Sequence, residues 1–163
     1  MSMVLVARRL TADEARLDPG QLADLALEED DEDSPGEDSM VDLDKTWHAV
    51  HFLLTGTAWE LEGDAGLAVL GGREVGDDLG YGPARVLAPP DVDATSRALS
   101  AVDEQALRAR FDPERMAALE IYPTGIWDED DILDDYVLPA FRDLAGLDAR
   151  AAAEGQAMLL LLT

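Results

Sequence analysis

The feature that most constrains the fold is the unbroken apolar run Ala157-Met158-Leu159-Leu160-Leu161-Leu162 near the end of the chain. A strand with one face in water alternates apolar and polar residues, whereas a strand without polar positions has to be covered on both faces. Six residues are also far too few to span a bilayer. We therefore expect a strand near the centre of a small sheet, with other elements packed on each side of it.

Two further segments have the composition of strands, residues 3–9 and Ala84 to Leu87. Helices are indicated by their starting signals, in which an aspartate suited to cap a helix comes first and proline often follows. These signals stand at Asp18-Pro19, Asp103 and Asp112-Pro113.

The longest helical pattern runs from Asp128 to about Glu154, and Pro139 inside it should kink or divide the helix. A chain of 163 residues is about the size of one domain. We predict a single α+β domain over residues 1–163, in which a small mixed sheet packs with several helices.

The chain is strongly acidic, with 36 acidic against 12 basic residues and a net charge of −24. Such a surface repels phosphate, which argues against nucleic acid and anionic membranes as ligands and permits a basic protein partner. Codon bias of a GC-rich genome and a halophilic origin are both open explanations of the excess of acidic residues.

There is no cysteine. The apolar N-terminal run precedes its charges, whereas in a signal peptide the charges come first. We expect a cytoplasmic protein.

The acids are unevenly spread, because eight of the twelve residues in 28–39 are acidic and none is apolar. Such a segment repels itself and has no apolar surface to bury. We predict an exposed loop here. It lacks the spaced oxygen ligands and central glycine of a calcium loop, and we expect no metal there.

A helix predicted over residues 43–54 carries the first candidate site. Asp44, His48 and His51 lie on one polar stripe of this helix, beside the apolar face that includes Trp47. A carboxylate and two imidazoles could bind a divalent metal or act as an acid–base pair. The two histidines are three residues apart, which matches no known zinc motif. The favoured interpretation is structural, with His51 donating to a backbone carbonyl in the core.

Two other segments could line a pocket. Tyr81 and Arg85 flank a glycine-rich turn that could cradle an anion, although it matches neither the P-loop nor the dinucleotide motif. Glu120 and Tyr122 come just before Pro123, where a cleft or a packed corner could form. For both segments the packed turn is the favoured alternative. The combined candidate pocket contains Asp44, Trp47, His48, His51, Tyr81, Arg85, Glu120 and Tyr122.

Several segments together resemble the YfbM-like family of bacterial proteins, a domain of unknown function. The resemblance rests on residues 42–56, Val69 to Gly72, Gly80 to Arg85 and Glu120 to Pro123, which occur in the family's order, and on the N-terminal Met1-Ser2-Met3. It implies an α+β domain of the bacterial cytoplasm. It brings no established activity, cofactor or catalytic residue.

Two hypotheses about function follow from these observations. The first is a small non-catalytic protein that binds a basic partner through an acidic face, for example as an immunity or inhibitor protein. The alternative is an enzyme or a small-ligand or metal-binding domain that uses the candidate pocket. We expect no bound cofactor, and the sequence indicates no oligomeric state.

Overall fold

The structure is a computed structural model that describes residues 2–28 and 39–163. It contains one five-stranded sheet with the order β2-β1-β5-β4-β3. The strands are β1 (Leu5–Leu10), β2 (Met40–Asp42), β3 (Arg73–Val75), β4 (Ala84–Leu87) and β5 (Ala157–Leu162). The C-terminal strand is therefore the central one, as the sequence predicts, and the α+β class is confirmed.

Every neighbouring pair of strands is antiparallel, so the prediction of a mixed sheet is wrong in this respect. β5 pairs with β1 along its whole length, from Leu5 opposite Leu162 to Leu10 opposite Ala157. It also pairs with β4, where Arg85 lies opposite Leu160. Apolar runs predict the burial of a strand but not the direction of its neighbours, because direction depends on the connections between strands.

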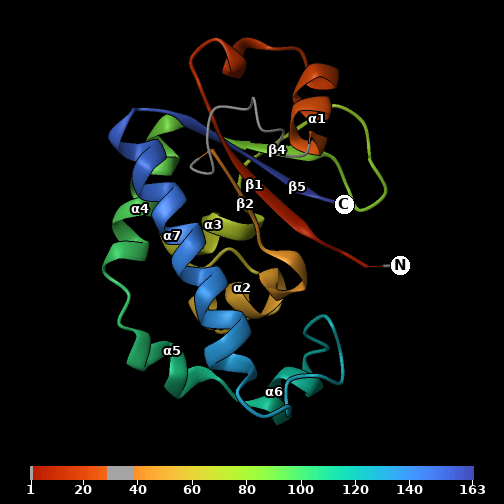
Figure 1. The fold of residues 1–163 in the computed structure, drawn as a ribbon, viewed down its shortest axis with the longest axis vertical. Coiled ribbons are helices and arrows are strands. Elements are labelled where there is room, and N and C mark those ends of the chain that lie inside the picture. Colours follow the sequence, from red (N-terminus) through yellow and green to blue (C-terminus); the bar gives the residue numbers. More distant parts are fainter. Residues whose placement is uncertain (1, 29–38) are drawn as a thin grey trace.

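The central strand is covered on both faces because helices lie on each side of the sheet (Figure 1). Met158 and Leu160 belong to the larger core, beneath most of the helices. Leu159 and Leu161 belong to a smaller core on the other face, where α1 supplies Leu22. This two-sided burial explains why β5 has no polar position within its buried part.

The helices are α1 (Pro19–Leu27), α2 (Trp47–Thr55), α3 (Leu67–Leu70), α4 (Pro89–Ser100), α5 (Glu104–Arg110), α6 (Pro113–Ala118) and α7 (Leu138–Ala153). Three of the helices, α1, α5 and α6, begin where the aspartate signals predict. The side chain of Asp18 accepts a hydrogen bond from the backbone N–H of Gln21. In return, the backbone N–H of Asp18 donates to the side-chain oxygen of Gln21. Asp103 and Asp112 cap α5 and α6 in the same way, each by accepting one backbone N–H bond. The three predicted caps are confirmed.

The long C-terminal helical pattern is shorter than predicted and changes from a π-helical turn to an α-helix next to its proline. Residues 128–131 are not helical, and a π-helical turn, Leu133–Val137, precedes α7. Pro139 lies in the first turn of α7, where a missing N–H breaks no helical hydrogen bond. The helix stops before Gly155, which has a φ of 63°. Regular α-helical hydrogen bonding begins only at Leu138, next to Pro139, but the helical backbone continues through this point, so the helix is not divided there.

The predicted acidic loop at 28–39 falls outside the described residues except for its ends, Glu28 and Ser39. In the part of the chain that the structure describes, no helix is long and apolar enough to cross a bilayer.

Candidate functional site

His48 joins three separate parts of the chain through a fully buried imidazole on α2. Its Nδ1 accepts the backbone N–H of Tyr122 at 2.9 Å. Its Nε2 then carries the proton and donates to the Ala58 carbonyl at 2.8 Å. Because both ring nitrogens have a partner, the contacts select one neutral tautomer. Burial lowers the pKa of His48 in agreement with this, although the bond to Ala58 opposes the shift.

Aromatic rings surround this imidazole. The ring of Trp47 stacks on it at 4.8 Å between centroids and 9° between planes, and Trp59 packs on it at 4.4 Å. Tyr122 stacks on Trp47 at 6.0 Å. The Trp47 indole N–H and the Tyr122 hydroxyl both bond to the backbone of Met3. These contacts fix the N-terminal segment against α2.

His51 is one turn further along α2 and is also fully buried. Its Nε2 donates to the Glu60 carbonyl at 3.1 Å, as the favoured structural interpretation expects. Its Nδ1 has no hydrogen-bond partner among the described residues. Burial is the largest cause that lowers the pKa of His51 to about 4, and repulsion from His48 when protonated and from Arg85 adds to it, so the ring is neutral at pH 7.

Arg85 does not offer its guanidinium to an anion in this structure. It donates to the carbonyls of Gly71 at 2.7 Å and Val69 at 3.1 Å, which closes the end of α3 onto β4. Burial lowers its pKa to about 10, and the nearby charge of Glu74 opposes that shift. The half-buried side chain therefore binds two backbone carbonyls.

The remaining members of the candidate pocket lie apart from the imidazoles. Asp44 accepts a hydrogen bond from the Tyr136 hydroxyl at 2.5 Å. Glu120 is exposed and has a φ of 54°. Within the described residues, Asp44, Tyr81 and Glu120 make no hydrogen bond, ion pair or ring contact with His48 or His51.

The structure therefore brings together five members of the candidate pocket and leaves three outside. Trp47, His48 and Tyr122 are in direct contact, and Arg85 is close enough to His51 to influence its pKa. No group of three or more acidic or histidine side chains in the described chain could hold a metal ion. A catalytic or ligand-binding role for this cluster stays a prediction, and its contacts are those of a structural joint.

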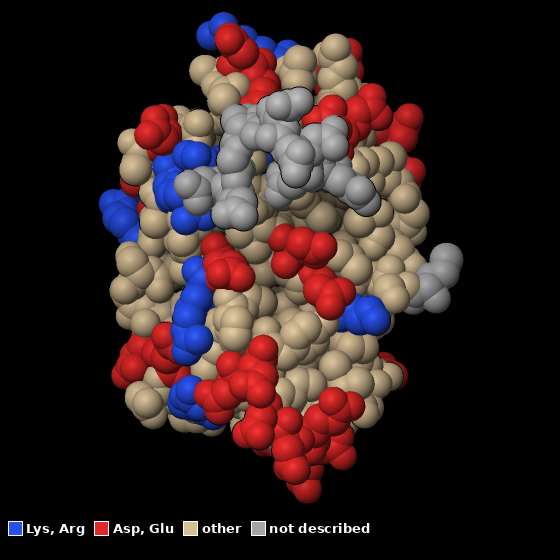
Figure 2. Space-filling model, in the orientation of Figure 1, with Lys and Arg blue, Asp and Glu red and all other residues tan. Residues whose placement is uncertain are grey.

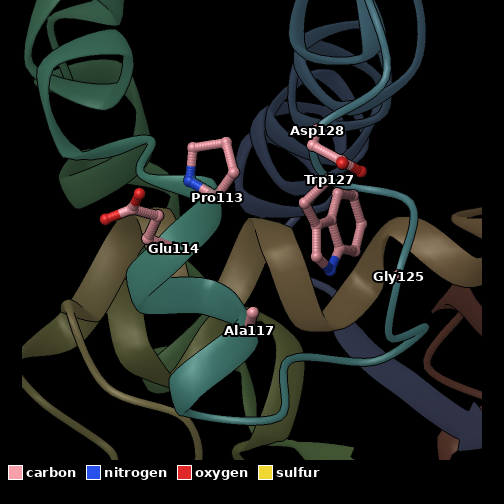
Figure 3. A pocket seen from close by; sticks show the side chains of 6 residues that line it. All are labelled: Pro113, Glu114, Ala117, Gly125, Trp127 and Asp128. Carbon is pink, nitrogen blue, oxygen red and sulfur yellow. The ribbon is translucent and has the colours of Figure 1, made fainter.

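Two surface hollows lie on either side of α6. One, of about 250 Å³, is lined by Pro113, Glu114, Ala117, Gly125, Trp127 and Asp128. Figure 3 shows the α6 side chains on one side of this hollow and the Trp127 indole on the other. The second, of about 370 Å³, is lined by residues 56–60 together with Arg115 and Leu119.

Comparison with known proteins agrees with the fold. The model of a domain of unknown function, DUF1877, matches residues 1–161. The chain belongs to this family. The crystal structure of YfbM from Escherichia coli, a protein of unknown function, is 23% identical, with 98% of this chain and 99% of that chain covered and a TM-score of 0.72. The YfbM-like resemblance is therefore confirmed, and the structural likeness shows the fold alone.

These descriptions name no activity, substrate or partner for the family, and no curated protein matches the chain. We therefore infer the function from the surface of this protein.

Sequence reasoning missed two residues that the structure makes prominent. Trp59 is 59% exposed, the most exposed large apolar side chain of the described residues. A lone tryptophan in a loop gives no signal of its exposure. Asp148, in contrast, is fully buried, and a signal existed, because it falls on the same helical stripe as Phe141, Leu144 and Ala151.

Proposed function

We propose that this domain is a non-catalytic protein-interaction module that binds a basic partner through the surface around α6. One observation carries the proposal: an apolar hollow with a tryptophan wall opens in the middle of a dense group of acidic side chains. An apolar pocket inside a charged rim is the usual anatomy of a protein interface.

The apolar wall of the hollow is fixed by a hydrogen bond of Trp127 to the backbone. The indole N–H of Trp127 donates to the Ile121 carbonyl at 2.9 Å, and only 3% of the residue is exposed. Pro113 and Ala117 face it from α6, while the carboxylates of Glu114 and Asp128 point outward on opposite sides (Figure 3). A partner side chain with an apolar stem and a cationic head would fit both features, because lysine and arginine combine them.

The charge around the hollow favours the same partner. We call the acidic end the set of exposed acids next to it, Glu114, Asp128, Glu129, Asp130, Asp131 and Asp135. Acidic side chains gather at this end of the molecule, over α6 and the segment that leads into α7 (Figure 2). Such a field accelerates association with a basic protein and repels nucleic acid.

The test compares charge-matched variants as bait in a bacterial lysate at low salt. Glu114→Gln with Asp128→Asn removes two charges at the hollow, and Asp13→Asn with Asp24→Asn removes two at the α1 end as the control. Neither control side chain makes a hydrogen bond or ion pair with any residue that the structure describes. We expect a basic protein that the wild type and the control retain and the hollow variant retains at least about fivefold less well, since rim charges contribute up to about 1 kcal/mol each. Equal retention by all three baits, or no basic protein, would contradict the proposal.

An immunity or inhibitor protein is one specific form of this proposal. It requires the retained partner to be a toxin or nuclease whose activity falls when the domain binds. The bacterial cytoplasm implied by the family resemblance is the setting that we propose for it.

The alternative function, an enzyme or ligand-binding domain, is supported by the Nδ1 of His51, which is buried near Arg85 and has no partner within the described part of the chain. A metal-dependent form predicts about one equivalent of zinc, manganese or nickel in protein purified without chelators. A content far below that would leave this form without support.

A further inference from the structure

Trp59 differs from the other two tryptophans in its exposure. Trp47 and Trp127 are buried, and each indole N–H has a backbone carbonyl as partner. Trp59 is 59% exposed, and the nearby Leu61 is 51% exposed. Exposed tryptophans are uncommon and are enriched among the residues that dominate binding energy at interfaces.

The loop that carries Trp59 is held on both sides of the tryptophan. The carbonyl before it, on Ala58, accepts from His48, and the carbonyl after it, on Glu60, accepts from His51. The hydroxyl of Thr57 also bonds to the backbone of Glu60. The indole packs against the His48 ring in a tilted arrangement, with 4.4 Å between the ring centroids. The exposed part of the ring is thus held in one orientation before any partner arrives, which lowers the entropic cost of binding.

The hollow beside this ring combines apolar walls with an acid. Its lining includes Ala58, Trp59, Leu119 and the acidic residue Glu60. Glu62 and Asp64 follow in the same loop and are exposed. Arg115 also lines the hollow. Because its positive charge repels another cation, a bound cation is most stable on the side of Trp59 and Glu60.

We propose that the hollow beside Trp59 binds an arginine or lysine side chain of a protein partner. The cationic group lies over the exposed face of the indole and pairs with Glu60. An indole is the best aromatic acceptor for a cation, and a carboxylate beside it reinforces the contact. The net charge of −24 favours a basic occupant and disfavours a second copy of the chain. We take this partner to be the basic protein that binds at the acidic end, and this identification rests on the proposed function.

A defined peptide tests this inference without knowledge of the partner. The probe is a hexapeptide of alternating arginine and glycine with blocked ends, and the control replaces each arginine by serine. Both are titrated into ¹⁵N-labelled protein, whose three tryptophans each give one indole N–H signal. The signal lost in Trp59→Leu identifies Trp59. The Trp127 signal, unchanged in that variant, shows that the fold is intact, whereas the Trp47 signal shifts because its ring lies 6.1 Å from that of Trp59.

We expect the arginine peptide to move the Trp59 signal in a saturable way at low salt, while the serine peptide leaves it in place. Trp59→Leu and Glu60→Gln should each weaken peptide binding about two- to fivefold. Asp24→Asn, on α1 at the opposite end of the molecule, should have no effect (Figure 1).

The inference is overturned if the Trp59 signal does not move, if the serine peptide moves it equally, or if it shifts with protein concentration alone. The Trp127 signal reports separately on the hollow of the acidic end. If the Trp127 signal moves and the Trp59 signal does not, the proposed function stands and this site is rejected. If only the Trp59 signal moves, this site stands and the proposed function is rejected.

Discussion

Asp148 provides the sharpest test of the packing, because replacing it by asparagine should change how stability depends on pH. The residue lies within α7, facing α4, and is fully buried. Neither carboxylate oxygen has a hydrogen-bond partner among the described residues. The hydroxyl of Thr95 is near enough to moderate the effect of burial, but its own bond goes to the Val92 carbonyl at 3.0 Å.

Burial raises the pKa of Asp148 from 3.8 to about 7, and Thr95 opposes only part of that rise. Between these values the folded protein holds a proton that the unfolded chain has lost. The free energy of unfolding contributed by this group therefore falls as pH rises from about 4 to about 7, and is constant above that. At about 1.4 kcal/mol for each unit of pKa, the loss is roughly 4 kcal/mol.

Asp148→Asn removes this titration and keeps the shape of the side chain. The amide can lose or gain stability at all pH values through its own unsatisfied groups, so the absolute difference from wild type is less informative than its change with pH. We expect the variant to gain about 4 kcal/mol relative to wild type between pH 4 and pH 8. Urea unfolding followed by circular dichroism at five or six pH values measures this change.

Asp143→Asn is the matched control, since Asp143 is exposed on the same helix. Its stability relative to wild type should stay within about 0.5 kcal/mol across the range. A pH-independent difference between Asp148→Asn and the wild type would contradict this prediction, because it would mean that Asp148 ionises as readily in the folded protein as in the unfolded chain.

Two further predictions concern α2 and its C-terminus. The pKa of His51 is lowered to about 4, so its contribution to stability is present above pH 6.5 and is lost as pH falls toward 4; His51→Gln should therefore be less pH-dependent than wild type over that window in the same urea assay. Gly56 ends α2 with a φ of 75°, and a Cβ there would meet only the Arg110 side chain at 3.7 Å or more. Gly56→Ala should cost about 1 kcal/mol from backbone strain alone, measured as a lower unfolding midpoint, whereas a cost above about 3 kcal/mol would indicate a clash.

Much of the fold could be predicted because the signals are local. An aspartate cap depends on residues within one turn, and the run from Ala157 to Leu162 needs only the rule that polar groups avoid the core. β2 and β3, in contrast, went unpredicted. Each is three residues long and lies at an edge of the sheet, where pairing with a neighbour, rather than composition, makes the segment a strand.

The candidate site shows a second limit of sequence reasoning. A polar stripe on a helix predicts a face in water or in a cleft only if the helix lies at the surface. Seven successive residues of α2, Trp47 to Leu53, are all buried. A helix enclosed on all sides has no solvent face, and its polar residues have to find partners in the core. Whether a helix lies at the surface or is enclosed depends on tertiary packing, which the local sequence does not determine.

The two buried histidines are better understood through the partners they satisfy than through chemistry of their own. A neutral imidazole offers one donor and one acceptor on a rigid ring, and His48 uses both to join Tyr122 to Ala58 across the core. His51 repeats the donation one turn later, to Glu60. Between those two carbonyls the chain turns outward and exposes Trp59. Protonation of His48 would place a second N–H against the Tyr122 N–H and break this joint. The exposure of Trp59 should therefore change in acid before the protein unfolds. The difference in fluorescence between the wild type and Trp59→Leu should report that change ahead of circular dichroism, because the chain has two other tryptophans.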